Sequence, residues 1–387
     1  MANVLNDLAA DIYTAADIVG RELTGGASSV MINANGSERV ALDDVVRSHF
    51  TRQATSAGIS PSMTIPEGTD QTVDSKTLSI SKAKGVQIPW TGEDMRHVNN
   101  GAGFETIYGD QIRQAMRTLT NEIEVDIMTE AYQNASRAVG TAGTTPFSGD
   151  FDLVAEARQI LVDNGAPMDG MSTMVLNTLA GTNLRNLARL QRANEAGGTD
   201  VLRQGVLLDL QGIAMKESAG VQAHTKGTTT GVTVTALTAV GSTSIGVTTS
   251  AGGSVGLTAG DILAIAGDSN KYVVAEDVTV GASTTGVITI ADPGLREAAS
   301  SSSAVTVGNS YTGNVAWHRN SLELAMRAPA VPQGGDTADD AMIIQDPNSG
   351  LVYEIRTYKG YRKAMFEVAA TWGTKAWKSD FIAAILG

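Results

Sequence analysis

The sequence contains no cysteine among its 387 residues. This absence excludes a disulfide framework, thiolate metal sites and thiol catalysis, and it suits a reducing compartment. Long apolar runs are also absent, because no stretch approaches the roughly 18 consecutive apolar residues of a membrane-spanning helix. The N-terminus has neither the basic start nor the apolar core of a signal peptide. We therefore expect neither export nor membrane insertion.

Basic residues are fewer than acidic ones, with 28 Lys and Arg against 41 Asp and Glu and a formal net charge of −13. No basic patch is interleaved with aromatic residues, and phosphate backbones repel such a chain, so we expect no specific grip on nucleic acid. The length allows two or three domains. Aromatic residues make up only 5% whereas 42 residues are glycine, which indicates many turns and β-structure.

Catalytic and nucleotide-binding motifs are missing. There is no phosphate-binding glycine loop and no dinucleotide-binding fingerprint. Residues 79–82 and 81–84 match the Ser-x-x-Lys pattern of penicillin-binding enzymes, but they lie in an alternating stretch without the companion motifs. The four histidines have no metal-ligand spacing and are expected to be hydrogen-bonding or capping residues: His49, His97, His224 and His318. We expect no enzyme, no cofactor and no metal site.

The longest helical pattern lies between Gly103 and Ser136. Its apolar residues recur three to five positions apart, which indicates one buried stripe on an α-helix without an internal proline. The stripe consists of Phe104, Ile107, Ile112, Met116, Leu119, Ile123, Ile127 and Ala131. At about 1.5 Å per residue the helix would be roughly 50 Å long, longer than most globular cores need. We expect it to span a large part of the molecule.

The opposite face of this helix carries Arg113 and Arg117, followed by Glu122, Asp126 and Glu130 at i, i+4 and i+8. Carboxylates stacked in this way repel one another, so the pattern predicts either a solvated face or a basic neighbour. A carboxylate metal site would need ligands from a second helix with similar periodicity, and none is apparent.

From Ser62 to Trp90 apolar and polar residues alternate, which predicts a long two-stranded excursion carrying Lys76, Lys82 and Lys84. An isolated two-stranded hairpin is marginal in water, so we expect it to lie against another surface, such as that of a neighbouring subunit. Ion pairing at the surface is the plain interpretation of the three lysines.

The remaining chain changes character twice. Residues 2–23 have helical periodicity, and 150–222 mixes helical and strand patterns, as in a compact α+β domain. Between Thr225 and Ser310 the composition shifts to Gly, Thr, Ser, Val and Ala, and Tyr272 is the only aromatic residue. Short alternating runs between glycine turns predict a small all-β barrel or sandwich, which we interpret as an insertion into a surface loop.

The order of these parts resembles the major capsid (coat) protein of tailed bacteriophages, in the branch similar to the coat protein of phage P22, with the HK97 fold. The resemblance covers nearly the whole chain and depends also on the following stretches: Met63 to Thr69, Val86 to Gly92, Arg117 to Glu124, Val315 to Asn320 and Tyr353 to Trp372. It implies an α+β, HK97-like fold with a long spine helix, an extended β-hairpin loop and an inserted all-β domain.

The resemblance also implies domain boundaries and a function. The domains would be an N-terminal arm 1–59, an extended loop 60–92, a peripheral domain 93–149 with spine helix 103–136, a first axial part 150–222, an inserted β-barrel-like domain 223–311 and a return 312–387. The chain would self-assemble, as hexamers and pentamers, into the icosahedral or prolate head shell that encloses the phage genome. Scaffolding, portal and decoration proteins would be its partners, with assembly in the host cytoplasm and a final place in the virion.

Two departures from the family limit this resemblance. The sequence has no long helical scaffolding prefix, so we expect any scaffold to be a separate protein. Some relatives cross-link a hairpin lysine to an asparagine of a neighbour, and we expect no such chemistry here. The candidate assembly-interface residues are the charged residues of the hairpin and the helix: Glu67, Asp70, Lys76, Lys82, Lys84, Arg113, Arg117, Glu122, Asp126 and Glu130.

Two other functions stay open. An encapsulin-like compartment shell would use the same fold, although the inserted module makes it less favoured. A β-rich surface or adhesion module would explain the Thr, Gly and Ser content, but the long amphipathic helix and the missing signal peptide argue against it.

Overall fold

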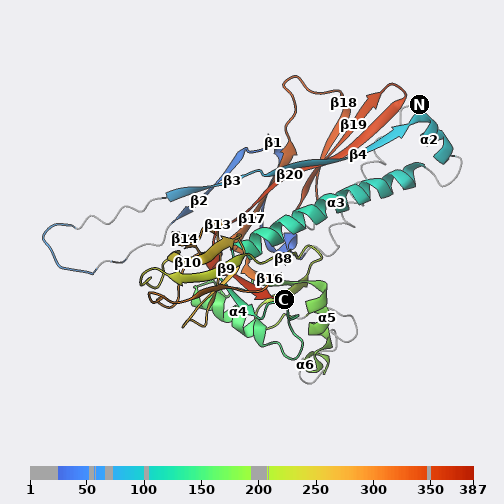
Figure 1. Ribbon diagram of the computed structural model, residues 1–387. Helices are drawn as coiled ribbons and strands as arrows, with labels where there is room; N and C mark the ends of the chain where they lie inside the picture. The colour runs from blue at the N-terminus through green and yellow to red at the C-terminus, as the bar shows by residue number, and fades with distance from the viewer. Residues whose placement is uncertain are drawn as a thin grey trace.

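The computed structural model describes residues 25–51, 56, 58–65, 73–99, 104–192, 207, 209–346 and 350–387. The helix expected over residues 2–23 lies outside the described residues. The described chain is a mixed α+β structure in which strands predominate (Figure 1).

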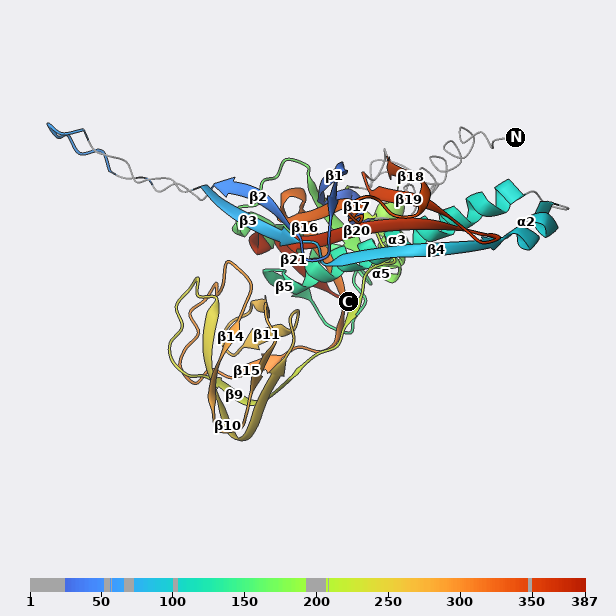
Figure 2. The same ribbon diagram turned by 90° about the horizontal axis from the view of Figure 1, so that it is seen from above.

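A six-stranded sheet and one long helix form the first part of the body. The 14-residue strand β20 pairs with β19, β17 and β4, and β1 runs parallel to β17. The helix α3, Phe104–Gln133, lies along this sheet (Figures 1 and 2). A short helix, α2, Gly92–Asn99, precedes it. The strands are β1 Met31–Val40, β4 Lys82–Thr91, β17 Leu322–Pro329, β18 Ala338–Gln345, β19 Val352–Gly360 and β20 Lys363–Ala376.

Helix α3 forms within the range 103–136 for which the sequence predicts a helix. The part of its stripe from Ile112 onward is buried, with Ile112, Met116, Leu119, Ile123 and Ile127 all within the main hydrophobic core. Burying each of these side chains is worth about 1.5–3 kcal/mol. The length of the helix therefore follows from its contact with both sheets.

A nine-stranded sheet with three covering helices forms the second part of the body. Its strand order is β15-β11-β12-β5-β21-β16-β6-β7, and β8 also pairs with β16. The helices are α4 Asp152–Asp163, α5 Thr178–Asn186 and α6 Ala188–Gln191. The strands are β5 Arg137–Gly140, β6 Ser172–Leu176, β7 Ala214–Glu217, β8 Ala223–His224, β11 Ile262–Ile265, β12 Lys271–Val273, β15 Val305–Val307, β16 Tyr311–His318 and β21 Ile382–Leu386.

A β-rich module, residues 225–310, projects from this body (Figure 2). Its separate sheet consists of β9 Thr228–Val234, β10 Ser244–Leu257, β13 Val278–Val280 and β14 Thr285–Thr289. Together with β11, β12 and β15, which the module contributes to the nine-stranded sheet, these strands enclose a hydrophobic cluster that belongs to the module. The module is also continuous with the body, because β12 pairs with β5 at Lys271 and Ala138.

The two-stranded excursion differs from the predicted one. Strand β2, Val45–Thr51, pairs antiparallel with β3, Val73–Ser79, and we call residues 45–79 the arm. Strand β4 instead returns to the body and pairs with β20 along its whole length, with Gly85 opposite Ala369. The predicted pairing within 62–90 was therefore wrong. Alternation shows that a segment is a strand, but the partner of that strand depends on contacts distant in sequence.

Candidate assembly interface

Two of the predicted interface lysines pair with carboxylates of the same chain. Lys82 Nζ lies 2.7 Å from Asp126 Oδ1, and Lys84 Nζ lies 2.6 Å from Glu122 Oε2. The lysines are two residues apart on β4, about 6.6 Å, and the carboxylates are four residues apart on α3, about 6 Å. Because β4 and α3 run in opposite directions, the two spacings match and both pairs form together.

The rest of the acidic face is also used within the chain. Asp126 Oδ2 accepts the indole N–H of buried Trp372 at 2.8 Å, and Glu130 Oε1 accepts the backbone N–H of Ala376 at 2.9 Å. Burial raises the pKa of Glu130, although the bond from Ala376 and the charge of Lys375 oppose this shift. Of the two alternatives predicted for this face, a solvated surface or a basic neighbour, the structure shows the basic neighbour, which is β4. The carboxylates fasten α3 to β4 and β20.

Lys76 also contacts its own chain. Its Nζ donates to the backbone carbonyl of Trp377 at 2.7 Å and lies 5.6 Å from the centre of the Trp377 ring. Burial, followed by the charge of Lys378, lowers the pKa of Lys76. This lysine therefore fastens the base of the arm to the body.

The two arginines make local contacts on α3. Arg113 pairs with Asp110 at 3.0 Å, and Arg117 donates to Gln114 Oε1 at 3.2 Å. Both partners lie three residues earlier on the helix, so these contacts support the helix surface. The two acidic candidates Glu67 and Asp70 lie outside the described residues.

The far end of the arm carries exposed apolar side chains that the sequence analysis did not select. Residues 58–65, which we call the arm tip, are all exposed and lie far from the body (Figures 1 and 2). Ile59, Met63 and Ile65 are 100%, 106% and 93% exposed. Large apolar side chains are mostly buried in folded proteins, and covering each of these is worth about 1.5–3 kcal/mol. The arm tip is thus an apolar contact surface that the described chain does not cover itself.

Glu124 is a further residue that the sequence analysis did not select. It is 3% exposed, and its carboxylate accepts the backbone N–H groups of Gly26 at 2.6 Å and Ala27 at 2.8 Å. These groups begin the short 3-10 helix η1, Ala27–Ser29, where a carboxylate satisfies otherwise free donors. Burial raises the pKa of Glu124, and its hydrogen bonds oppose this shift. Helix α3 therefore also anchors the segment before β1.

A buried polar cluster holds the junction between body and module. His224 and Tyr311 lie opposite each other on β8 and β16, and Tyr132 of α3 meets both rings edge-on, with centroids 5.6 and 6.2 Å away. His224 Nε2 lies 3.0 Å from Asp261 Oδ1, and the Tyr311 hydroxyl donates to the Gly260 carbonyl at 2.6 Å. Burial raises the pKa of Tyr311. The two connections to the module are therefore held together at one point.

Hydrogen bonds at this junction also act on Asp261. Burial alone would raise the pKa of Asp261, but hydrogen bonds from His224 and from the backbone N–H groups of Thr258 and Gly227 lower it.

His318, like His224, is buried and hydrogen-bonded. It pairs with Asp169 at 3.1 Å and accepts the Asn320 N–H. For His224 and His318, the predicted hydrogen-bonding or capping role is confirmed.

Within the described residues, no group of three or more His, Asp or Glu side chains is arranged to hold a metal ion. No helix in the described part of the chain is both long enough and apolar enough to cross a membrane. The groups that remain available for contact with another molecule include the arm tip and the outer surface of the β-rich module.

No protein-family model matches the chain, and no curated protein sequence matches it. Several solved structures do. A chain from Mycobacterium phage Che8 is 13% identical, with 88% of this chain and 84% of that chain covered and a TM-score of 0.46. The capsid structure of the cyanophage P-SCSP1u is 9% identical, with coverage of 93% and 86% and a TM-score of 0.47. A virus-like particle from Pyrococcus furiosus is 8% identical, with coverage of 98% and 99% and a TM-score of 0.44.

Proposed function

We propose that the chain is a structural subunit that assembles with copies of itself into a closed shell, as a major capsid protein of a tailed phage. The observation that carries this proposal is the arm tip. Exposed apolar side chains grouped as Ile59, Met63 and Ile65 are typical of a site that contacts another molecule, and a neighbouring copy is always present in a shell. Each subunit would supply one arm tip and cover one.

The elements fit an HK97-like subunit under this proposal. Helix α3 would be the spine of the peripheral domain. Helix α4 and the strands of the nine-stranded sheet that lie outside the β-rich module would form the axial domain. The extended loop would be the β2–β3 arm, not the stretch 60–92, because β4 belongs to the body. The β-rich module would be the inserted domain, near the proposed boundaries 223–311.

The charge of the chain suits a shell around DNA. With a net charge of −13 the subunit would enclose the genome without binding it specifically. Contacts that are weak one at a time would hold the shell because each subunit repeats them around closed symmetry. A separate scaffolding protein, a portal and a decoration protein would be its partners, and the role would be structural, not enzymatic.

The proposal is tested by removing the apolar arm tip. The full chain would be expressed alone and with a candidate scaffolding protein, and particles would be measured by sedimentation velocity and negative-stain microscopy. We expect megadalton shells from the unchanged chain. The triple variant Ile59→Ser, Met63→Ser, Ile65→Ser should remain as 40.1 kDa subunits or small oligomers.

The matched control replaces three exposed apolar residues of the body: Met168→Ser, Met171→Ser and Leu179→Ser. It should assemble like the unchanged chain. Circular dichroism and thermal unfolding should show both variants folded. Shells of normal yield from the arm-tip variant, or a small oligomer from the unchanged chain under every condition, would contradict the proposal.

A further inference from the structure

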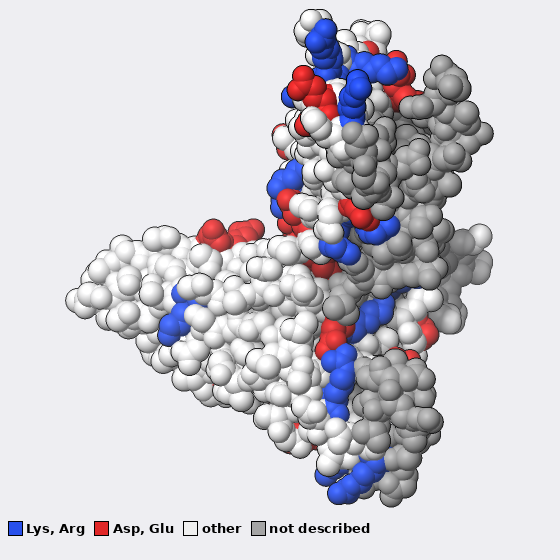
Figure 3. Space-filling model, turned by 90° about the vertical axis from the view of Figure 1, so that its right-hand side faces the viewer, with Lys and Arg blue, Asp and Glu red and all other residues white. Residues whose placement is uncertain are grey.

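The separate sheet of the β-rich module contains no charged residue. No Asp, Glu, Lys, Arg or His occurs from Thr228 to Gly260 or from Val278 to Ala291, in a chain where 18% of residues are charged. In Figure 3 the projecting β-rich module is almost entirely white, which means that few Lys, Arg, Asp or Glu side chains lie on it. The body beside it carries all four residue types. This surface therefore differs in kind from the rest of the described molecule.

The outward side chains of this sheet are small. Along β10, buried and exposed residues alternate, so that Ile245, Val247 and Val255 enter the module core. The opposite side presents mainly Thr, Ser and Gly. We call this surface the module face, and its exposed residues include Thr228, Thr230, Ser244, Ser250, Thr285 and Val287. The module face thus contains no long flexible side chain.

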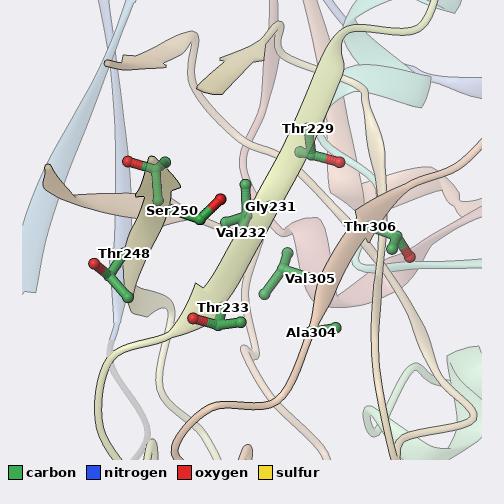
Figure 4. A pocket seen from close by; sticks show the side chains of 10 residues that line it. Thr229, Gly231, Val232, Thr233, Thr248, Ser250, Ala304, Val305 and Thr306 are labelled. Carbon is green, nitrogen blue, oxygen red and sulfur yellow. The ribbon is translucent and has the colours of Figure 1, made fainter. Parts of the chain in front are cut away.

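One hollow extends from this face to β15. It has a volume of about 370 Å³ and lies between β9, β10 and β15 (Figure 4). Thr229, Thr233 and Thr248 line it together with Val305 and Thr306. Hydroxyl and small apolar groups of this kind suit an uncharged protein side chain better than a charged ligand.

We propose that the module face is a contact surface for the module face of a second copy of this chain, packed sheet against sheet. The inference depends on the proposed function in one respect only, namely that copies of the chain contact one another. Two identical charged faces would place like charges opposite one another, and burying ions would add a desolvation cost. An uncharged face meets its own copy without either cost, and interface cores are depleted in charged residues in the same way.

Side-chain entropy favours the same contact. Lys, Glu and Arg lose much rotamer freedom when they are immobilised, whereas Gly has no side-chain freedom to lose and short side chains lose little. A face of Thr, Ser and Gly therefore orders at little entropic cost. Its hydroxyl groups are able to form hydrogen bonds across the contact.

The area of the module face suits a weak, repeated contact. Strand β10 has a bulge between Thr249 and Ser254, so its 14 residues span only about 11 extended positions, or about 35 Å. Three strand widths of about 4.8 Å then give an area of about 500 Å². Stable dimers bury about 800 Å² per partner, and incidental contacts usually bury less than about 400 Å² per partner. We therefore expect an association that is weak for two isolated copies and is reinforced in a shell.

The absence of cysteine makes a direct test available. Single variants Thr248→Cys, Ser250→Cys and Val287→Cys would be treated with an oxidant and with a short bis-maleimide reagent, because a disulfide requires Cβ atoms about 4 Å apart. Met168→Cys on the body is the matched control. At least one face variant should give cross-linked dimers several-fold above the control. If no face variant gives more cross-linked dimer than the control, the proposal is wrong.

The test is made on two samples, so that it is independent of shell formation. One is the assembled particle, and the other is the concentrated arm-tip triple variant. Cross-linking in the second sample would show the face contact without shells. If the arm-tip variant forms particles, the proposed function is contradicted. The cross-linking result would still show whether two module faces contact each other.

Charges of both signs at one position separate a face contact from general repulsion. Val287→Glu and Val287→Lys, each combined with Thr248→Cys, should both lower cross-linking several-fold, because either charge is buried without a partner. General repulsion between acidic subunits would instead be relieved by the lysine. Cross-linking that rises with Val287→Lys would therefore contradict the proposal.

Discussion

The body and the β-rich module of this chain use charge in opposite ways. In the body, Lys82 and Lys84 on β4 pair with Asp126 and Glu122 on α3, and buried Glu124 fastens the start of η1. The sheet of the module has no charged residue. The difference teaches that, in this chain, a conspicuous charge pattern marks contacts within the subunit.

The physical reason is the cost of pairing charges. Within one chain the two partners are held close by the fold, so little additional freedom is lost when the pair forms. Between two identical acidic chains, charged faces repel and must be desolvated. The surfaces that we propose for contact between copies, the arm tip and the module face, are accordingly apolar or uncharged.

The largest effect is expected from breaking the body core. Trp372 is fully buried, and its indole N–H donates to Asp126. Trp372→Ala should lower the free energy of unfolding by about 3–5 kcal/mol, because it leaves a cavity below α3. Urea unfolding would measure the change. Trp372→Phe, which keeps most of the ring volume, should cost clearly less, and equal costs for the two variants would contradict this account.

A core change in the module should be large but local. Ile288 is fully buried opposite Ile245 in the cluster that belongs to the module alone. Ile288→Ala should cost about 2–5 kcal/mol. Hydrogen exchange should rise in β9, β10 and β14 and stay unchanged in α3. Faster exchange of equal size in α3 would show instead that module and body unfold as one unit.

The junction should give a pH-dependent effect of intermediate size. The pKa of Asp261 is lowered in the folded protein, so its contribution is present above the unfolded value of 3.8 and is lost as the pH falls through the folded value. Asp261→Asn should cost about 1–3 kcal/mol at pH 7, since an amide N–H₂ then faces a donor. In urea unfolding, the difference from the unchanged chain should shrink at pH 3. A cost that is equal at both pH values would contradict this role.

The smallest effect is expected at the charge pairs of α3. Lys84 and Glu122 are both partly exposed, so Lys84→Ala should cost about 0.2–1 kcal/mol and less at high salt. The control is Lys359→Ala, which removes a more exposed pair with Asp339. The control should leave the free energy of unfolding unchanged within the error of the measurement. A cost above about 2 kcal/mol for Lys84→Ala would show that the pair is a major support of α3.

Much of the local structure was predictable. The apolar stripe of α3 predicts its position to within three residues, because 3.6-residue periodicity is a property of the segment itself. The composition shift after Thr225 predicts the β-rich module for a similar reason. The partner of β3 was not predictable, because every alternating strand offers the same edges to several others.

The candidate site was predictable only in part. The acidic face of α3 predicts either a solvated surface or a basic neighbour, and nothing in the sequence decides between them or places the selected lysines on β4 of the same chain. Ile59 and Met63 look like ordinary apolar residues, since exposure is not encoded in residue type. Glu124 lies beside two other acidic residues and gives no separate signal.

By itself, the sequence determined the position of helix α3, the absence of cysteine chemistry, and the β-rich character of residues 225–310. These are properties of residue type and short-range periodicity. Only the tertiary structure decided that β2 pairs with β3, that the charges of β4 and α3 neutralise each other, and that Ile59, Met63 and Ile65 remain uncovered. These three features depend on contacts between segments that are distant in sequence. Which of the alternative contacts forms is decided by burial and geometry across the whole fold.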